Sequence, residues 1–155
     1  ALPILRSAGV EDQQWKFYLG RDILPDNILY PVLMVRDRVV HDSTIPADQV
    51  ALKLQYAEER YKTSQALLEN QSVPLAISTL TKYQKYVISA GYQALSFEDL
   101  NKDQLQVSLE AAQASLERTE GLASENPQHD FSTIDQLRSD TKILVSKLEE
   151  QLSKF

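Results

Sequence analysis

Two histidines, His41 and His129, are the residues best suited to binding a metal, and an aspartate directly follows each of them. Imidazole and carboxylate groups both ligate divalent ions, but a protein site needs three or more ligands that converge. The chain has no His-x3-His or Glu-x-x-His spacing to supply the others. We therefore expect no metal and no cofactor, and we interpret both histidines as residues of helix ends or loops.

The sequence also gives no indication of catalysis by paired carboxylates, by a nucleophile or by a phosphate-binding loop. The adjacent pairs Glu58, Glu59 and Glu149, Glu150 diverge by about 100° on a helix, so neither pair can share a proton. The sequence has no cysteine, and it lacks the Gly-x-Ser-x-Gly, Gly-x-x-x-x-Gly-Lys and Gly-x-Gly-x-x-Gly motifs. We predict that the protein is not an enzyme and has no small-molecule substrate.

Composition and charge narrow the class of protein further. The 155 residues fit one domain, and 43% hydrophobic with 25% charged residues is typical of a folded chain. The net charge is −6 and no dense Lys/Arg run occurs, so a nucleic-acid surface is not expected. No apolar run approaches the ~20 residues of a membrane span.

The remaining pattern is helical. Residues 46–70 and 72–95 each carry an apolar or small residue at alternating steps of four and three, which keeps one face of a helix toward a partner. The two stripes are Val50, Leu54, Ala57, Tyr61, Ser64 and Leu68, then Ala76, Leu80, Tyr83, Val87, Ala90 and Ala94. Both helices are expected to pack as an antiparallel hairpin, joined near Gln71.

A second helical hairpin is expected from residues 102–124 and 132–155. Its stripes are Leu105, Leu109, Ala112, Leu116 and Thr119, then Ile134, Leu137, Thr141, Leu144 and Leu148. Ser132 and Asp135 resemble a capping box at the start of the last helix. Glu58 and Lys62 have the spacing of an ion pair on the outer face of the helix over residues 46–70.

The predicted fold is therefore all-α: an antiparallel bundle of four long helices plus one shorter N-terminal helix at residues 28–42. Residues 27–155 form a single helical-bundle domain. Residues 1–26 precede it as an extended N-terminal arm, because four Pro and Gly residues interrupt any helical period there.

Large apolar residues of this arm and some tyrosines are the candidate binding surface. Residues 1–5 could dock into a neighbouring subunit or onto their own bundle, and residues 15–24 could wrap the bundle. Tyrosine is enriched at protein interfaces, although ordinary packing at the edge of a core accounts for it as well. The candidate interface residues are Leu2, Ile4, Leu5, Trp15, Tyr18, Tyr56 and Tyr86.

Three segments resemble an uncharacterised domain family of secreted or surface-anchored bacterial proteins. They are ILPDNILYP at residues 23–31 with VRDRV at 35–39, AEERYKTS at 57–64, and AISTLTKYQKY at 76–86. The first is similar to a Leu-Pro-(Asp/Gly)-x-x-x-Tyr entry motif, and the second to an Ala-Glu-x-Arg helix. The resemblance implies an extracytoplasmic helical module and no catalytic residues.

These observations lead to two hypotheses. The first is a non-catalytic extracytoplasmic bundle that acts through a protein partner or self-association, as a structural subunit of a surface assembly or an accessory subunit of an envelope complex. The start at Ala1 alone fits a removed signal peptide as well as it fits a trimmed end or a removed initiator Met. Together with the resemblance, it leads us to expect a secreted, periplasmic or cell-surface protein whose signal peptide is removed before Ala1. The second hypothesis is a periplasmic metal or small-ligand sensing bundle, based on the two His-Asp pairs.

Overall fold

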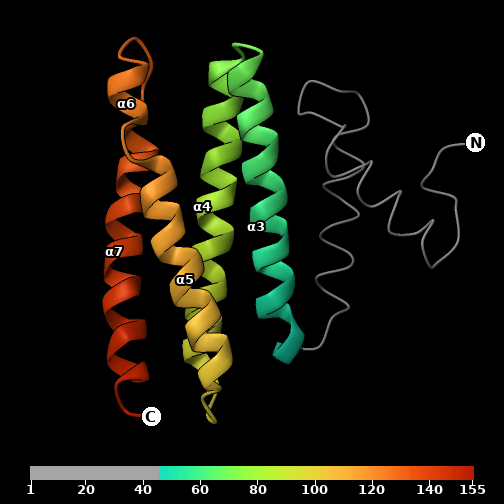
Figure 1. Ribbon diagram of the computed structural model, residues 1–155, viewed down its shortest axis with the longest axis vertical. Coiled ribbons are helices and arrows are strands. Elements are labelled where there is room, and N and C mark those ends of the chain that lie inside the picture. The colour runs from blue at the N-terminus through green and yellow to red at the C-terminus, as the bar shows by residue number, and fades with distance from the viewer. Residues whose placement is uncertain (1–45) are drawn as a thin grey trace, which may run out of the picture.

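The computed structural model describes residues 46–155, and within that range every regular element is a helix (Figure 1). The elements are α3 (Pro46–Glu69), α4 (Val73–Ser96), α5 (Lys102–Thr119), α6 (Leu122–Glu125) and α7 (Ser132–Leu152). The all-α prediction is confirmed for these residues, which include the four long helices expected from the sequence. The predicted arm at residues 1–26 and helix at residues 28–42 lie outside the described range.

The apolar stripes form the core as their spacing predicts. All six stripe residues of α4 are buried, with Ala76 and Ala90 completely inaccessible. On α3, Val50, Ala57 and Ser64 are buried, and the three larger stripe residues pack half-buried against the same core. The stripes of α5 and α7 are buried as well, apart from the half-buried Leu116 and Leu137. Burying this apolar surface is the main force that holds the helices together.

A Schellman motif ends α3 and turns the chain into α4. The backbone N–H of Ser72 donates to the carbonyl of Leu67 at 2.8 Å, and that of Gln71 donates to the carbonyl of Leu68 at 3.0 Å. Gln71 has a φ of 60°, in the left-handed region that glycine usually occupies at this position. The tight turn therefore places α3 and α4 side by side.

Side chains on one face of this hairpin pair in a regular antiparallel register. Gln93 Nε2 donates to Gln49 Oε1 at 2.7 Å, and the rings of Tyr56 and Tyr86 lie 5.6 Å apart. The members of the first pair are each 22 residues from Gln71, and those of the second are each 15 residues from it. Helices α3 and α4 therefore keep one antiparallel register over most of their length.

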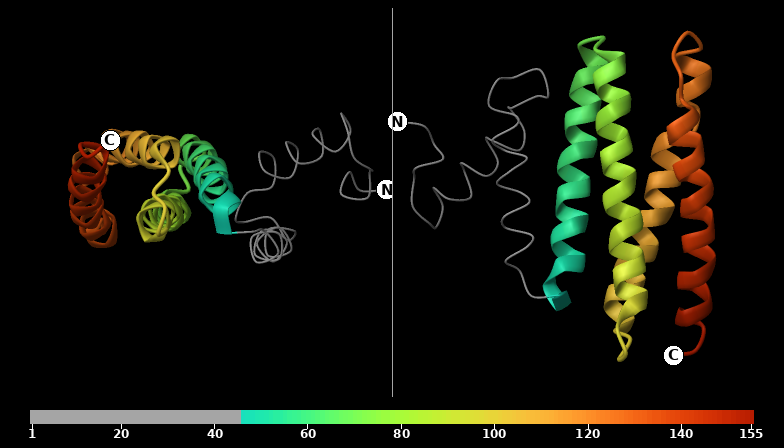
Figure 2. Two further views of the ribbon diagram at one scale, coloured as in Figure 1. Left: turned by 90° about the horizontal axis from the view of Figure 1, so that it is seen from below. Right: turned by 180° about the vertical axis from the view of Figure 1, so that it is seen from behind.

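Helix α4 is central, because it packs against α3, α5 and α7. Helices α3 and α7 lie on opposite sides of the described region, with α4 and α5 between them (Figures 1 and 2). Helices α4 and α7 approach each other closely at Gly91, where a Cβ atom would lie 2.5 Å from Leu144 Cδ2. Glycine at this position lets the two helices come close enough to bury Leu144 completely.

The predicted single helix over residues 102–124 is wrong at its C-terminal end, after residue 119. Asn101 caps α5 by accepting a hydrogen bond from the Gln104 N–H at 3.1 Å, but α5 ends at Thr119. Gly121 then adopts a φ of 81°, which breaks the helix before the single turn of α6. Glycine adopts the left-handed conformation with little strain, so α5 can end just before Gly121. The helical period of the sequence continues past this residue and therefore does not reveal the end of the helix.

The predicted capping box at the start of α7 is also wrong. Phe131 occupies the N-cap position without a side-chain cap, and its buried side chain joins the core. Asp130 supplies the polar contact instead, because its Oδ1 accepts the Ser132 N–H at 2.9 Å. The hydrogen bonds from Ser132 hold the pKa of Asp130 below its ordinary value.

Candidate functional site

Five of the candidate interface residues lie outside the described range, namely Leu2, Ile4, Leu5, Trp15 and Tyr18. The other two, Tyr56 and Tyr86, contact each other across α3 and α4 with their rings inclined at 60°. Tyr56 is buried and Tyr86 is half-buried. Their role in an interface stays a prediction, and so does that of the other five.

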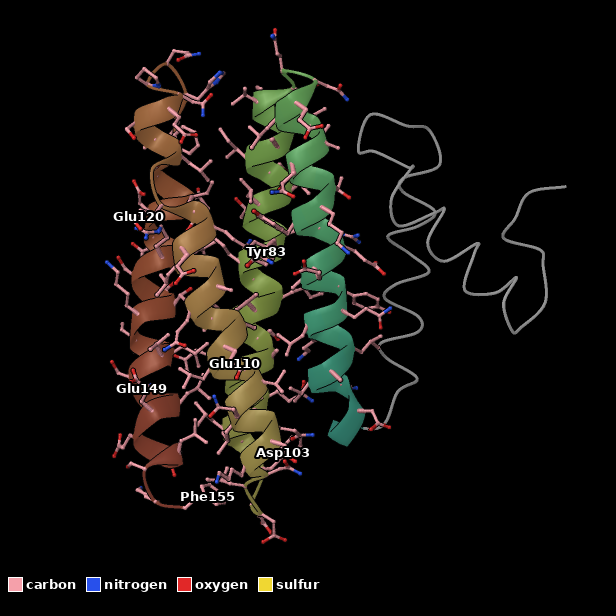
Figure 3. All side chains as sticks on the ribbon, in the orientation of Figure 1. Tyr83, Asp103, Glu110, Glu120, Glu149 and Phe155 are labelled. Atoms are coloured by element: carbon pink, nitrogen blue, oxygen red, sulfur yellow. The ribbon has the colours of Figure 1, made fainter. Side chains whose placement is uncertain are left out.

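The fold brings together a polar cluster that the sequence did not reveal, formed by Glu58, Tyr61, Tyr83 and Arg118. Arg118 on α5 reaches across to α3, where its Nη1 and Nη2 donate to the two carboxylate oxygens of Glu58 at 2.8 and 3.3 Å. Nη1 also donates to the Tyr83 hydroxyl on α4 at 3.4 Å. One side chain thus ties three helices together, and Tyr83, the member of the cluster on α4, is labelled in Figure 3.

Two aromatic rings support the guanidinium group in this cluster. The Cζ atom of Arg118 lies 4.0 Å from the centroid of the Tyr61 ring, which is cation–π geometry. The rings of Tyr61 and Tyr83 are 5.3 Å apart. Burial lowers the pKa of Arg118, but its hydrogen bonds to Glu58 and Tyr83 raise it more, so the net pKa lies above the ordinary value. The guanidinium group is therefore held as a charged clamp between the helices.

The predicted ion pair of Glu58 with Lys62 is wrong, because the carboxylate of Glu58 turns toward α5 and binds Arg118. Sixty residues separate Glu58 from Arg118 in the sequence. No local spacing relates the two positions, since their contact depends on how α5 packs beside α3.

A groove, which we define by the residues that line one cavity, lies next to this cluster between α3, α4 and α5. Helices α3 and α5 lie on the same side of α4 (Figure 2, left), and each packs more extensively against α4 than against the other. A cavity of about 80 Å³ opens in the groove, and its lining is mostly apolar. The lining residues are Leu54, Ala57, Glu58, Tyr83, Val87, Ala111, Ala114 and Arg118.

The α5 side of the groove carries an exposed apolar residue within an acidic row. Val107 is 50% exposed, although it follows the same helical spacing as the cavity-lining Ala114. Asp103, Glu110 and Glu117 continue that spacing at alternating steps of four and three, and all three are exposed. Glu110 also accepts a hydrogen bond from Gln106 Nε2 at 3.2 Å, which leaves its charge in place.

A second, wider pocket of about 510 Å³ lies at the end of the helices where the α3–α4 turn meets the segment after α6. Its lining includes Leu68, Gln71, Val73, Glu125, Asn126, Gln128 and His129. This pocket brings the half-buried His129 together with one carboxylate and three carboxamides. Among residues 46–155, however, no three His, Cys, Asp or Glu side chains gather as a metal site would require.

Comparison with known protein families gives one match. The model of one family, described as a domain of unknown function (DUF5667), matches residues 22–154. The chain belongs to the DUF5667 family. No curated protein and no solved structure matches the chain. Membership in DUF5667 agrees with the uncharacterised family expected from the sequence, and it assigns no activity.

A second arginine of this DUF5667 domain is held by contacts between helices. Arg138 on α7 resembles Arg118 in this respect, because its Nε donates to Thr119 Oγ1 at 2.9 Å and its Nη2 to the Leu116 carbonyl at 3.0 Å. These contacts secure the end of α5 just before Gly121. In the described part of the DUF5667 domain, no helix is both long and apolar enough to cross a membrane.

Proposed function

We propose that this protein is a non-catalytic, extracytoplasmic helical module that acts through protein contacts. It serves as a structural subunit of a surface assembly or as an accessory subunit of an envelope complex. The proposal includes the complete organisation expected from the sequence, with an arm at residues 1–26 followed by one antiparallel bundle over residues 27–155. The extracytoplasmic location rests on the resemblance of residues 23–39, 57–64 and 76–86 to secreted or surface-anchored domains.

The open groove between α3 and α5 is the observation that supports this proposal most. Its cavity is lined by Leu54, Val87, Ala111 and Ala114, and the half-exposed Val107 extends the apolar surface along α5. The ionisable groups at its end, Glu58 and Arg118, bind each other. Such a surface can bury apolar area against another protein, whereas its charged groups are already engaged in holding the fold.

The experiment combines the mass in solution with contacts in the cell. Sedimentation of the full chain over a concentration series, with and without residues 1–8, reports self-association through the arm. A photo-reactive amino acid at position 107, and separately at position 4, reports proteins that touch the groove or the arm in the organism that makes the chain. We expect a covalent adduct with a protein, or a large species in solution. A strict monomer that forms no adduct at either position contradicts the proposal.

The wider pocket supports a second candidate function, the sensing of a small ligand. A volume of about 510 Å³ falls in the range of small-molecule sites, and the pocket offers His129, Glu125 and three carboxamides as hydrogen-bonding groups. A ligand that binds the folded state raises the melting temperature. Thermal denaturation against a panel of small polar molecules and divalent ions tests this, and a shift that His129→Ala abolishes would favour sensing over protein contact.

A further inference from the structure

We propose that the groove between α3 and α5 binds a basic amphipathic helix of a partner protein. An apolar side chain of that helix fills the cavity of about 80 Å³, and its Lys or Arg residues lie over the acidic row of α5. This inference rests on the proposed function and adds to it the chemistry of the partner.

The apolar half of the partner follows from the lining of the groove. Leu54, Val87, Ala111 and Ala114 surround the cavity, and the half-exposed Val107 continues this surface along α5. The polar side chains that also line the cavity, Glu58 and Tyr83, are bound by Arg118, so the aliphatic part of the lining is left to contact an apolar side chain of the partner. Because Ala111 and Ala114 are small, the backbone of a partner can approach α5 closely at this position.

The helical form of the partner follows from the spacing of residues on α5. The row formed by Asp103, Val107, Glu110, Ala114 and Glu117 advances in steps of four and three, which is the spacing at which two helices pack side by side. Helix α5 has 18 residues and is therefore about 27 Å long. A helix laid in such a groove presents apolar residues at i, i+3, i+4 and i+7, which is a common mode of peptide recognition.

The basic half of the partner follows from charge. Asp103, Glu110 and Glu117 recur every seven residues on the face of α5 that carries Val107, and Figure 3 labels Asp103 and Glu110 there. The cation that lines the cavity, Arg118, is bound by Glu58. The whole chain has a net charge of −6. A cationic helix complements this surface, whereas a second copy packed groove to groove would bring the same acidic row against it.

The test uses the full-length chain and two labelled synthetic peptides of 18 residues. Both peptides have Leu and Ala on one helical face; the other face carries Lys in the first peptide and Glu in the second. Fluorescence anisotropy measures binding at low and at physiological salt. We expect the Lys peptide to bind at least tenfold more tightly than the Glu peptide. Its affinity should fall as salt rises, because screening weakens contacts between exposed charges.

Matched variants distinguish the groove from general attraction to an acidic protein. Val107→Asp and Glu110→Lys change the groove, while Ile143→Asp and Glu149→Lys make the same changes on α7, which does not line the cavity. Val107 and Ile143 are 50% and 52% exposed, so all four variants should keep the fold, which circular dichroism verifies. We expect each groove variant to weaken the Lys peptide at least tenfold and each α7 variant to change its affinity less than twofold.

Several outcomes would overturn the inference. Equal losses from the α7 variants mean that the peptide binds by net charge alone. A Glu peptide that binds as tightly as the Lys peptide refutes the basic character of the partner, and the absence of binding by both peptides refutes the groove. If sedimentation shows an oligomer of the full chain that Val107→Asp dissociates, the groove holds a second copy.

The outcomes separate this inference from the proposed function. If a protein is crosslinked to position 4 of the arm in cells but neither peptide binds, the proposed function is supported and the binding of a helix in the groove is refuted. Selective binding of the Lys peptide to a chain that stays monomeric and forms no adduct in cells supports the chemistry of the groove and contradicts the proposed function.

Discussion

At the scale of single residues, Arg118 stabilises the contact between three helices by two means. Its bidentate ion pair with Glu58 is partly exposed, so it contributes only about 0.2–1 kcal/mol. Its stacking on Tyr61 adds about 0.5–1 kcal/mol. We expect Arg118→Ala to lower the free energy of unfolding by about 1–2 kcal/mol, and Glu58→Gln to lower it by less than about 1 kcal/mol. Urea denaturation of both variants measures this, and equal losses would mean that the stacking contributes nothing.

Tyr83 gives the stability a dependence on alkaline pH. Burial raises its pKa above the ordinary value, and the hydrogen bond from Arg118 opposes only part of that rise. Below about pH 10 both the folded and the unfolded state hold the proton. As the pH rises further, the unfolded state loses its proton first, so the contribution of Tyr83 to stability decreases through its folded pKa.

Replacing Tyr83 by Phe removes this ionisation. We expect the free energy of unfolding of Tyr83→Phe to decline less steeply than that of the parent chain as the pH rises above about 10. Near pH 7 the variant should lose no more than about 1 kcal/mol, because the hydrogen bond to Arg118 is long at 3.4 Å. Urea denaturation over a pH series measures both effects. Parallel pH profiles would contradict this account, and Tyr92→Phe on an exposed ring is the control.

At the scale of elements, the spacing of α4 and α7 depends on Gly91. An alanine there would place its Cβ atom 2.5 Å from Leu144, which is completely buried and has little room to move. We expect Gly91→Ala to destabilise the protein by about 1–2 kcal/mol, since overpacking outweighs the ~1 kcal/mol gain in helix propensity. A double-mutant cycle with Leu144→Ala tests the cause. In that background Gly91→Ala should become neutral or stabilising, and additive losses would rule out the clash.

The turn between α3 and α4 contains a removable strain. Gln71 has a φ of 60°, a conformation in which glycine has no Cβ penalty. We expect Gln71→Gly to raise the free energy of unfolding by about 0.5–1 kcal/mol, because the relief of strain exceeds the added entropy of the unfolded chain. Thermal denaturation measures the change, with Gln71→Ala as the control that should give no gain. A loss with glycine would show that the Gln71 side chain itself contributes at the wider pocket.

Helices were easier to predict from the sequence than their ends and their mutual contacts. The stripe through Ala76, Tyr83 and Ala90 fixes the buried face of α4, because the period of a helix is local information. Gly121 stands within an otherwise helical period, so only its left-handed conformation in the structure reveals the end of α5. The pairing of Glu58 with Arg118 and the groove beside it depend on how distant helices pack, which no local spacing encodes.

At the scale of the whole molecule, the central position of α4 should set the order in which the described helices open. Helix α4 packs against three other helices, while α6 is a single turn whose preceding glycine is left-handed. We expect hydrogen exchange to be slowest in the middle of α4, around Tyr83 to Ala90, and fastest in α6. Native-state exchange followed by mass spectrometry measures this order. Exchange in α4 as fast as in α6 would mean that the helices open without a shared core.

The register of the α3–α4 hairpin also limits how the length of this domain can vary. Gln49 with Gln93, and Tyr56 with Tyr86, stand at equal distances on either side of Gln71. An insertion in only one of the two helices would shift each residue between the insertion and the far end of that helix away from its partner on the other helix. It would also rotate the buried stripe by about 100° for each inserted residue. Insertions of seven residues at matching positions in α3 and α4 would preserve the pairs, and they would keep the buried stripe on nearly the same face of each helix. Longer and shorter hairpins of this type should therefore differ by the same number of heptads in the two helices, with the turn unchanged.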